Sequence, residues 1–236
     1  MRRTFEDALD WSAAGTRLFL DAAAGWGEEQ YGAPSGLPGW TRKHLVAHVA
    51  ANADALSNLV RWAATGEETP MYSSMGQRNA DIEAGSVKPA AELAAWLRES
   101  ADRLAAGTAA LSPEQWDAKV VTAQGRTVPA TEIPWLRSRE ACVHAVDLAA
   151  GVSFADLPAA FLAALADDIA GKRGGAAGPT VVLTATDTGD RWELPGEGDA
   201  VAVTGPLAEI TAYLAGRPHA LTTPDGSSVP VLPAWL

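Results

Sequence analysis

The sequence TRKHLVAHVAANADALSNLVRWAATG, which spans residues 41–66, determines the fold class that we predict. Threonine favours the N-cap of a helix and glycine the C′ position, so Thr41 and Gly66 delimit a predicted helix over residues 42–65. At about 100° per residue, the apolar residues of this helix fall on one stripe. They are Leu45, Val49, Leu56, Leu59 and Val60. A long helix with one apolar stripe buries that stripe against other helices, which favours a helical bundle.

Three further long helices and one short helix are predicted in the first two thirds of the chain, from the spacing of apolar residues and from breaker residues. The long ones cover about residues 5–25, a segment from Pro89 through Leu104, and residues 134–150, and the short one covers residues 77–84. Pro89 and Pro134 stand in first helical turns, and Gly151 ends the last helix. A hairpin or an extended loop is predicted over residues 120–128. Four long helices connected in this way indicate a four-helix bundle.

The composition changes after Gly151. One more helix is predicted near residues 157–172, and a breaker rich in glycine, alanine and proline follows. Strand-like runs and a last helix come next, at residues 180–186, 191–194, 200–204 and 206–215. We therefore expect an α plus α/β architecture, with a helical domain over residues 1–153 and a smaller α/β domain over residues 154–236.

The charge balance excludes several classes of partner. Lysine and arginine total 18 against 29 aspartate and glutamate residues, for a formal charge of -11. A field of that sign repels phosphate backbones and anionic lipids, which disfavours nucleic acid and membrane surfaces as partners. The single cysteine, Cys142, cannot form an internal disulfide, and no apolar run near the N-terminus is long enough for a signal core or a membrane span. We expect a cytoplasmic monomer.

Histidine 48 lies within the apolar stripe of the helix over residues 42–65, and His44 lies at its border. His48 therefore points into the bundle. A histidine in such a stripe is more often a core residue with one satisfied hydrogen bond than a metal ligand. From this helix alone, the structural interpretation is favoured.

The helix that begins near Pro134 changes this assessment. Glu140 and His144 are four residues apart, so they share one face, and that face also carries Leu136 and Asp147. An inward carboxylate is costly unless it is paired or binds a metal. Glu140, His144 and His48 together form a set of two histidines and one carboxylate. Such a set leaves one coordination position of a metal free, as in catalytic zinc sites. Asp147 could accept the other ring N–H of His144. Glu-x-x-x-His pairs are also common on solvated helix faces, so the spacing alone leaves both interpretations open.

Longer stretches of the sequence resemble the mycothiol-dependent maleylpyruvate isomerases. They are GWTRKHLVAHVA over residues 39–50, TGEETPMY over 65–72, TAQGRTVP over 122–129 and RSREACVHAVDL over 137–148. The resemblance extends into the second half of the chain, to Ala215-Gly216-Arg217 and to the closing Ala234-Trp235-Leu236.

The resemblance implies a DinB-like four-helix N-terminal domain and a C-terminal domain similar to sterol carrier protein type 2. It also implies a zinc ion bound by the residues that match His48, Glu140 and His144, and a catalytic arginine that matches Arg217. The chain retains all four residues. The Pro218-His219 pair departs from the family pattern, which leaves the geometry of that loop open.

The implied reaction converts maleylpyruvate to fumarylpyruvate, a cis-to-trans change that follows the ring cleavage of gentisate in aromatic degradation. Addition of a thiolate makes the conjugated double bond single, and rotation and elimination then give the trans product. Zinc would deprotonate the thiol of mycothiol at its free coordination position. Cys142 lies on the opposite side of its helix from Glu140, which fits a nucleophile that comes from the cofactor.

The dicarboxylate substrate requires cationic residues in this acidic protein. Arg217, just beyond Gly216, could bind a carboxylate or stabilise enolate charge. By sequence alone, an arginine at that place is more often a partner of the helix dipole, and the resemblance reverses this preference. Arg126 and Arg78 are weaker candidates for substrate binding, because a solvated surface position suits them equally well.

Two other functions remain open at this point. A mycothiol S-transferase that acts on another electrophile or on a biosynthetic intermediate would use the same metal and the same thiol. A non-catalytic metal-binding or regulatory module on the same bundle would have a closed coordination shell or no access for a thiol, whereas the isomerase needs an open position.

Overall fold

The computed structural model describes residues 3–173, 178–233 and 235. The chain forms two compact units, of which one comprises Thr4–Val152 and the other contains Ser153–Leu236. Most of the predicted breaker after residue 172, together with residues 234 and 236 of the closing segment, lies outside the described residues. In the part of the chain that is described, no helix has the length and hydropathy to cross a membrane.

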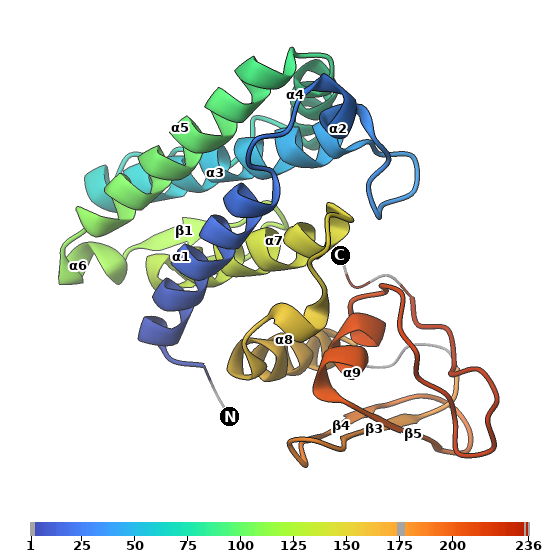
Figure 1. Cartoon of the computed structure of the whole chain (residues 1–236). Helices are drawn as coiled ribbons and strands as arrows, with labels where there is room; N and C mark the ends of the chain where they lie inside the picture. The colour runs from blue at the N-terminus through green and yellow to red at the C-terminus, as the bar shows by residue number, and fades with distance from the viewer. Residues whose placement is uncertain (1–2, 174–177, 234, 236) are drawn as a thin grey trace. The chain divides into compact units, whose positions relative to one another are not determined.

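Four long helices form the bundle of the first unit (Figure 1). They are α1 (Phe5–Ala22), α3 (Arg42–Thr65), α5 (Ala90–Ala109) and α7 (Ile133–Asp147). Helix α1 packs against α7, and α3 packs against both α5 and α7. The predicted four-helix bundle is therefore confirmed, and the bounds of α3 are those expected from Thr41 and Gly66. Gly66 adopts the left-handed conformation, with φ 74°, that ends a helix at low cost.

Shorter elements connect the long helices. They are α2 (Glu28–Gly32), α4 (Met75–Ser86), α6 (Pro113–Trp116), β1 (Lys119–Val121), β2 (Thr127–Pro129) and the 3₁₀ turn η1 (Ala130–Glu132). The antiparallel pair β1–β2 is the predicted hairpin, and α4 is the predicted short helix with two further residues at each end. Helices α2 and α6 were not predicted, because four or five residues give no helical period.

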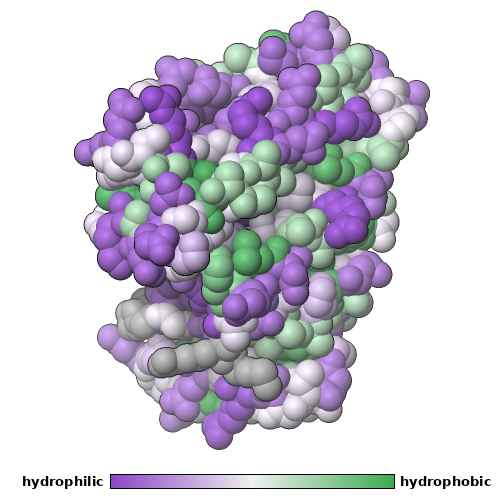
Figure 2. Space-filling model, turned by 90° about the vertical axis from the view of Figure 1, so that its left-hand side faces the viewer, coloured by the Kyte–Doolittle hydropathy of each residue, from purple (hydrophilic) through white to green (hydrophobic). Residues whose placement is uncertain are grey.

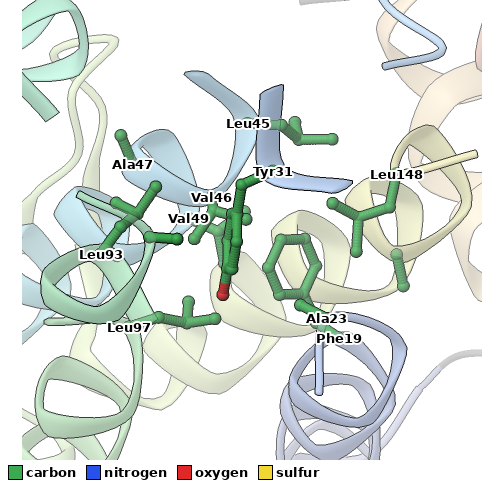
Figure 3. Packing of buried hydrophobic residues seen from close by; sticks show 13 residues of the cluster. Phe19, Ala23, Tyr31, Leu45, Val46, Ala47, Val49, Leu93, Leu97 and Leu148 are labelled. Carbon is green, nitrogen blue, oxygen red and sulfur yellow. The ribbon is translucent and has the colours of Figure 1, made fainter. Parts of the chain in front are cut away.

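The core at one end of the bundle is built around two aromatic rings. Phe19 and Tyr31 lie in the middle of this cluster, with Leu93 and Leu97 on one side and Leu148 on the other (Figure 3). All five side chains are buried, and they come from the three helices α1, α2 and α5 and from the residue that follows α7. This packing holds α3 and α7 together at the end of the bundle where both carry histidines.

The second unit is a two-layer α/β structure. Its elements are the turn η2 (Phe154–Asp156), helix α8 (Ala159–Lys172), strands β3 (Val181–Ala185), β4 (Arg191–Leu194) and β5 (Val201–Gly205), and helix α9 (Leu207–Leu214). The strand order is β4-β3-β5. Strand β3 is antiparallel to β4 and parallel to β5, so the sheet is mixed. Residues alternate between buried and less buried along β3, because α8 and α9 pack against the sheet. The expected α plus α/β class is confirmed.

One face of the surface is predominantly hydrophilic. On the face shown in Figure 2, hydrophilic residues surround smaller apolar patches. This distribution agrees with the large excess of acidic residues in the sequence.

Candidate metal centre

Helices α3 and α7 place three potential ligands together. His48 comes from α3, and Glu140 and His144 come from α7. Atom Nε2 of His48 lies 3.0 Å from Oε2 of Glu140, and Nε2 of His144 lies 3.3 Å from the same oxygen. One ligand atom of each residue lies within 4.8 Å of the other two. The spacing of Glu140 and His144 by one helical turn and the inward direction of His48 together produce this arrangement.

The three side chains differ in protonation. Burial lowers the pKa of His48, although Glu140 opposes this effect. Burial acts to raise the pKa of Glu140, but the hydrogen bonds with His144 and His48 hold it well below its usual range. Burial also acts to lower the pKa of His144, and its hydrogen bonds to Asp147 and Glu140 raise it to about 9. At neutral pH the site therefore holds an ionised Glu140, a protonated His144 and a neutral His48.

Aspartate 147 orients His144 from behind. Its Oδ2 lies 2.8 Å from Nδ1 of His144, and the carboxylate is buried, with a side-chain exposure of 3%. Nδ1–H of His144 donates to this oxygen, which leaves Nε2 directed toward Glu140. Histidine ligands of metals are commonly held in this way, by a carboxylate on the outer ring nitrogen.

Aromatic and polar residues surround His48 of α3. The ring of Trp40 lies edge-on to His48 at 5.7 Å and stacks on His44 at 6.2 Å. His44 itself accepts the backbone N–H of Thr41 at Nδ1, so it caps the start of α3 and faces Glu83 with its other nitrogen. The structure therefore gives His44 a structural contact and keeps it separate from the three-residue set.

Arginine 78 of α4 reaches the site. Its Nη2 lies 3.3 Å from Nδ1 of His48. Because a guanidinium group only donates, Nδ1 accepts this bond, and Nε2 of His48 then carries the proton that points to Glu140. Tyr72 also contacts Arg78, and burial, followed by the charge of Glu140, raises the pKa of this phenol to about 12.

Tyr72 is the residue near this site that the sequence reasoning did not single out. It lies in the loop between α3 and α4, where no periodic pattern marks an inward side chain. Only the resemblance over residues 65–72 points to this segment.

The other two arginine candidates belong to the β1–β2 hairpin and to the second unit. Arg126 is exposed at the turn of the β1–β2 hairpin, and no bond joins it to the three-residue set in the described parts of the chain. Arg217 follows α9 in the second unit, where its Nη1 donates to the carbonyl oxygen of Ala215 at 2.6 Å. That bond is the helix-end contact that the sequence alone favoured. Arg217 also has interactions beyond this one.

The donor set fits a divalent metal such as zinc. Two imidazole nitrogens and one carboxylate oxygen are ligands that zinc takes in catalytic sites, with a fourth position left to a small molecule. Within the described residues, no further histidine, cysteine, aspartate or glutamate belongs to the group that His48, Glu140 and His144 form. A closed shell of four protein ligands is therefore not what these residues build.

Comparisons with known proteins agree on one family. The family model described as "Mycothiol maleylpyruvate isomerase N-terminal domain" matches residues 12–149. The crystal structure of the mycothiol-dependent maleylpyruvate isomerase is similar to the whole chain, with 40% sequence identity and a TM-score of 0.91. The match covers 99% of this chain and 98% of that one. A crystal structure of a histidine-to-alanine mutant of that enzyme matches with the same values. A search of curated proteins gave no match.

Proposed function

The chain belongs to the mycothiol maleylpyruvate isomerase family, whose members are enzymes, and we propose that it converts maleylpyruvate to fumarylpyruvate with a bound zinc ion and mycothiol. The observation that carries the proposal is the convergence of His48, Glu140 and His144 without a fourth protein ligand among the described residues. Because a thiol cofactor requires a reducing compartment, we also propose that the reaction takes place in the cytoplasm.

The chain offers no nucleophile of its own for this reaction. Its single cysteine, Cys142, is buried, and burial raises the pKa of this thiol to about 12. A reaction that proceeds through a thiolate therefore needs a thiol from outside the chain. Zinc, when bound, would lower the pKa of that thiol, and mycothiol would supply the sulfur that adds reversibly to the double bond.

The roles of the protein side chains follow from their contacts. His48, Glu140 and His144 would hold the metal, since Nε2 of each histidine lies beside Oε2 of Glu140. Asp147 keeps the proton of His144 on Nδ1, so Nε2 of that ring is available as a ligand. The charge of Glu140 makes the site more favourable for a divalent cation than two neutral imidazoles alone would be.

Arginine 78 would change its contact when the metal binds. In the structure it donates to Nδ1 of His48 while Nε2 carries the ring proton. If a metal binds at Nε2, the ring proton of His48 must be on Nδ1. Arg78 cannot accept a hydrogen bond from Nδ1–H, because a guanidinium group only donates. Arg78 would then turn away from His48 and become available for a carboxylate of the substrate. We propose Arg217 as the catalytic arginine that binds the substrate or stabilises its enolate charge, and Arg126 as a weaker anchor.

The proposal is tested by the loss of ultraviolet absorbance of maleylpyruvate, measured on protein of known metal content with and without mycothiol. We expect turnover only when both zinc and mycothiol are present. Equal rates with any small thiol, or activity in metal-free protein, would contradict the cofactor assignment. A stable thioether product, detected by mass spectrometry, would instead identify an S-transferase.

Variants make this test specific to the site. His48→Ala and His144→Ala should lose zinc and activity while the helix content stays the same. His44→Ala is the matched control, because this histidine lies on the same helix and is not one of the three ligands. Arg217→Ala should keep zinc and lose turnover, and unchanged kinetics would remove Arg217 from the mechanism.

A further inference from the structure

A groove with a volume of about 640 Å³ lies between α1 and α5 of the helical unit. Its volume is in the range of sites that bind small molecules. Apolar side chains form most of its lining, among them Leu9, Leu20, Leu104, Trp116 and Ile133. None of the three proposed metal ligands lines it, so it is separate from the proposed metal site.

Arginine 137 of α7 lies at the buried end of this groove. It lines the groove, although the residue is only 1% exposed. Its Nε donates to Oγ1 of Thr16 at 3.2 Å, and its Nη1 donates to the carbonyl oxygen of Val49 at 2.9 Å and to Oδ1 of Asn52 at 3.1 Å. All three acceptors are neutral. In the described parts of the chain no carboxylate forms an ion pair with this guanidinium group.

The remaining nitrogen of Arg137, Nη2, donates to none of the described residues. It is also absent from the buried nitrogen atoms that lack both a partner and contact with solvent, so it is not sealed inside the protein. Since Arg137 lines the groove and its Nε and Nη1 are bonded to the protein, Nη2 is the nitrogen left for a ligand in the groove. A buried cation without a directly bonded anion is unfavourable, and neutral acceptors compensate only part of the cost.

Glu140 and Asp54 act on Arg137 through their charge, but neither forms a hydrogen bond with it, and Glu140 is bonded to His48 and His144. The lining also contains Arg17, Asp21 and Asp102, which are exposed. Water screens charges at the surface, so the charge that a ligand meets at the buried end is that of Arg137. Burial lowers the pKa of Arg137 to about 10, which still leaves it protonated at neutral pH.

We propose that this groove binds an amphipathic carboxylate, with the carboxylate on Nη2 of Arg137 and the apolar chain between α1 and α5. The carboxylate supplies the directly bonded anion that Arg137 lacks, and it matches the planar donor geometry of a guanidinium group. The apolar chain matches a lining of leucine, alanine, isoleucine and tryptophan. The site is independent of the proposed isomerase reaction.

The test is a calorimetric titration of the full chain, loaded with zinc, with octanoate and with its uncharged analogue octanamide. We expect octanoate to bind at least about tenfold more tightly, because only octanoate provides the charge for Arg137. Arg137→Met should reduce the affinity for octanoate to that for octanamide. Equal affinities of the wild-type protein for the two compounds would overturn the proposal.

Substitution of either of two alanines by tryptophan locates the binding site without changing Arg137. Ala105 and Ala106 are adjacent and exposed on α5, and only Ala105 lines the groove. Ala105→Trp should fill the groove and weaken octanoate binding by about tenfold or more, while Ala106→Trp should bind as the wild type does. Octanoate binding that survives Ala105→Trp would place the compound elsewhere, for example at the zinc, and would overturn the proposal.

Discussion

Oδ2 of Asp147 lies 2.8 Å from Nδ1 of His144, one helical turn along α7. This contact determines which nitrogen of His144 faces Glu140 and His48. It is also the contact most easily tested without removing a ligand. Such carboxylates tune metal affinity while the ligand set stays complete.

We expect Asp147→Asn to weaken zinc binding by about 10- to 100-fold, because the amide holds the imidazole less firmly and without charge. Competition with a chromophoric chelator measures the affinity. Asp54→Asn is the control, because Asp54 lies on α3, bonds to Trp96 and Arg103, and is not part of the ligand set. Equal zinc affinities of the Asp147→Asn variant and the wild type would show that Asp147 does not support the site.

Zinc binding at pH 7 should release about one proton, and this proton comes from His144. Without metal, the pKa of His144 is raised from 6.5 to about 9. The proton therefore stabilises the metal-free fold fully below about pH 6.5, and this contribution is lost as the pH rises through about 9. Glu140 is already ionised, and neutral His48 only moves its single ring proton from Nε2 to Nδ1, so neither releases a proton.

The apparent zinc affinity should accordingly rise about tenfold per pH unit from pH 7 and level off above about pH 9. Calorimetry at pH 7 in two buffers of different ionisation enthalpy measures the proton release directly. A binding heat that does not depend on the buffer would contradict the predicted charge state of His144.

Arg78→Met should separate substrate binding from metal binding. The variant removes a donor that faces Nδ1 of His48, so zinc affinity should stay the same or increase. It also removes the proposed partner of a substrate carboxylate, so KM should rise by about tenfold or more. Arg61→Met serves as the control, because Arg61 is exposed on α3 and pairs with Glu67. Loss of zinc together with an unchanged KM would reverse the role that we propose for Arg78.

The contact between α1 and α7 depends on Gly15. A Cβ at this position would overlap Sγ of Cys142 and lie 3.3 Å from its backbone nitrogen. We expect Gly15→Ala to lower the free energy of unfolding by about 1–3 kcal/mol, and Cys142→Ala in the same chain to restore part of it. Gly76→Ala in α4 is the control, because its Cβ would meet Oγ of Ser74 only at an ordinary distance of 3.7 Å.

Urea unfolding followed by circular dichroism measures these differences. A Gly15→Ala variant as stable as the wild type would mean that α1 and α7 move apart to accommodate the added Cβ at little cost in free energy. Cys142→Ala alone should keep the isomerase activity, since the buried thiol takes no part in the proposed reaction.

The parts of the fold that local signals encode could be predicted from the sequence. Thr41 and Gly66 mark the two ends of α3 through capping, which depends only on neighbouring residues. Helix α6 carries a signal of the same kind, since Ser112 and Gln115 form a capping box, but it is too short for a hydrophobic period. The pairing of β3 with β5 depends on a crossover through space that residue patterns do not specify.

The candidate site likewise has features that the sequence predicts and features that depend on tertiary packing. The inward direction of His48 and the shared face of Glu140 and His144 follow from helical spacing. The contact of Arg78 with His48 and the burial of Tyr72 depend on how α4 and its preceding loop fold over α3, which no spacing rule gives. The acceptors of the buried Arg137 likewise depend on tertiary packing, because α3 brings the carbonyl of Val49 and the amide of Asn52 to it.

The central claim is that the bound metal coordinates the sulfur of mycothiol, and cobalt substitution tests it most directly. The protein is loaded with Co²⁺ in place of zinc, and its absorption spectrum is recorded as mycothiol is added. We predict a thiolate-to-cobalt charge-transfer band in the near ultraviolet that saturates at one mycothiol per cobalt and is absent in His144→Ala. A cobalt-loaded wild-type protein whose spectrum does not change with mycothiol would contradict the claim.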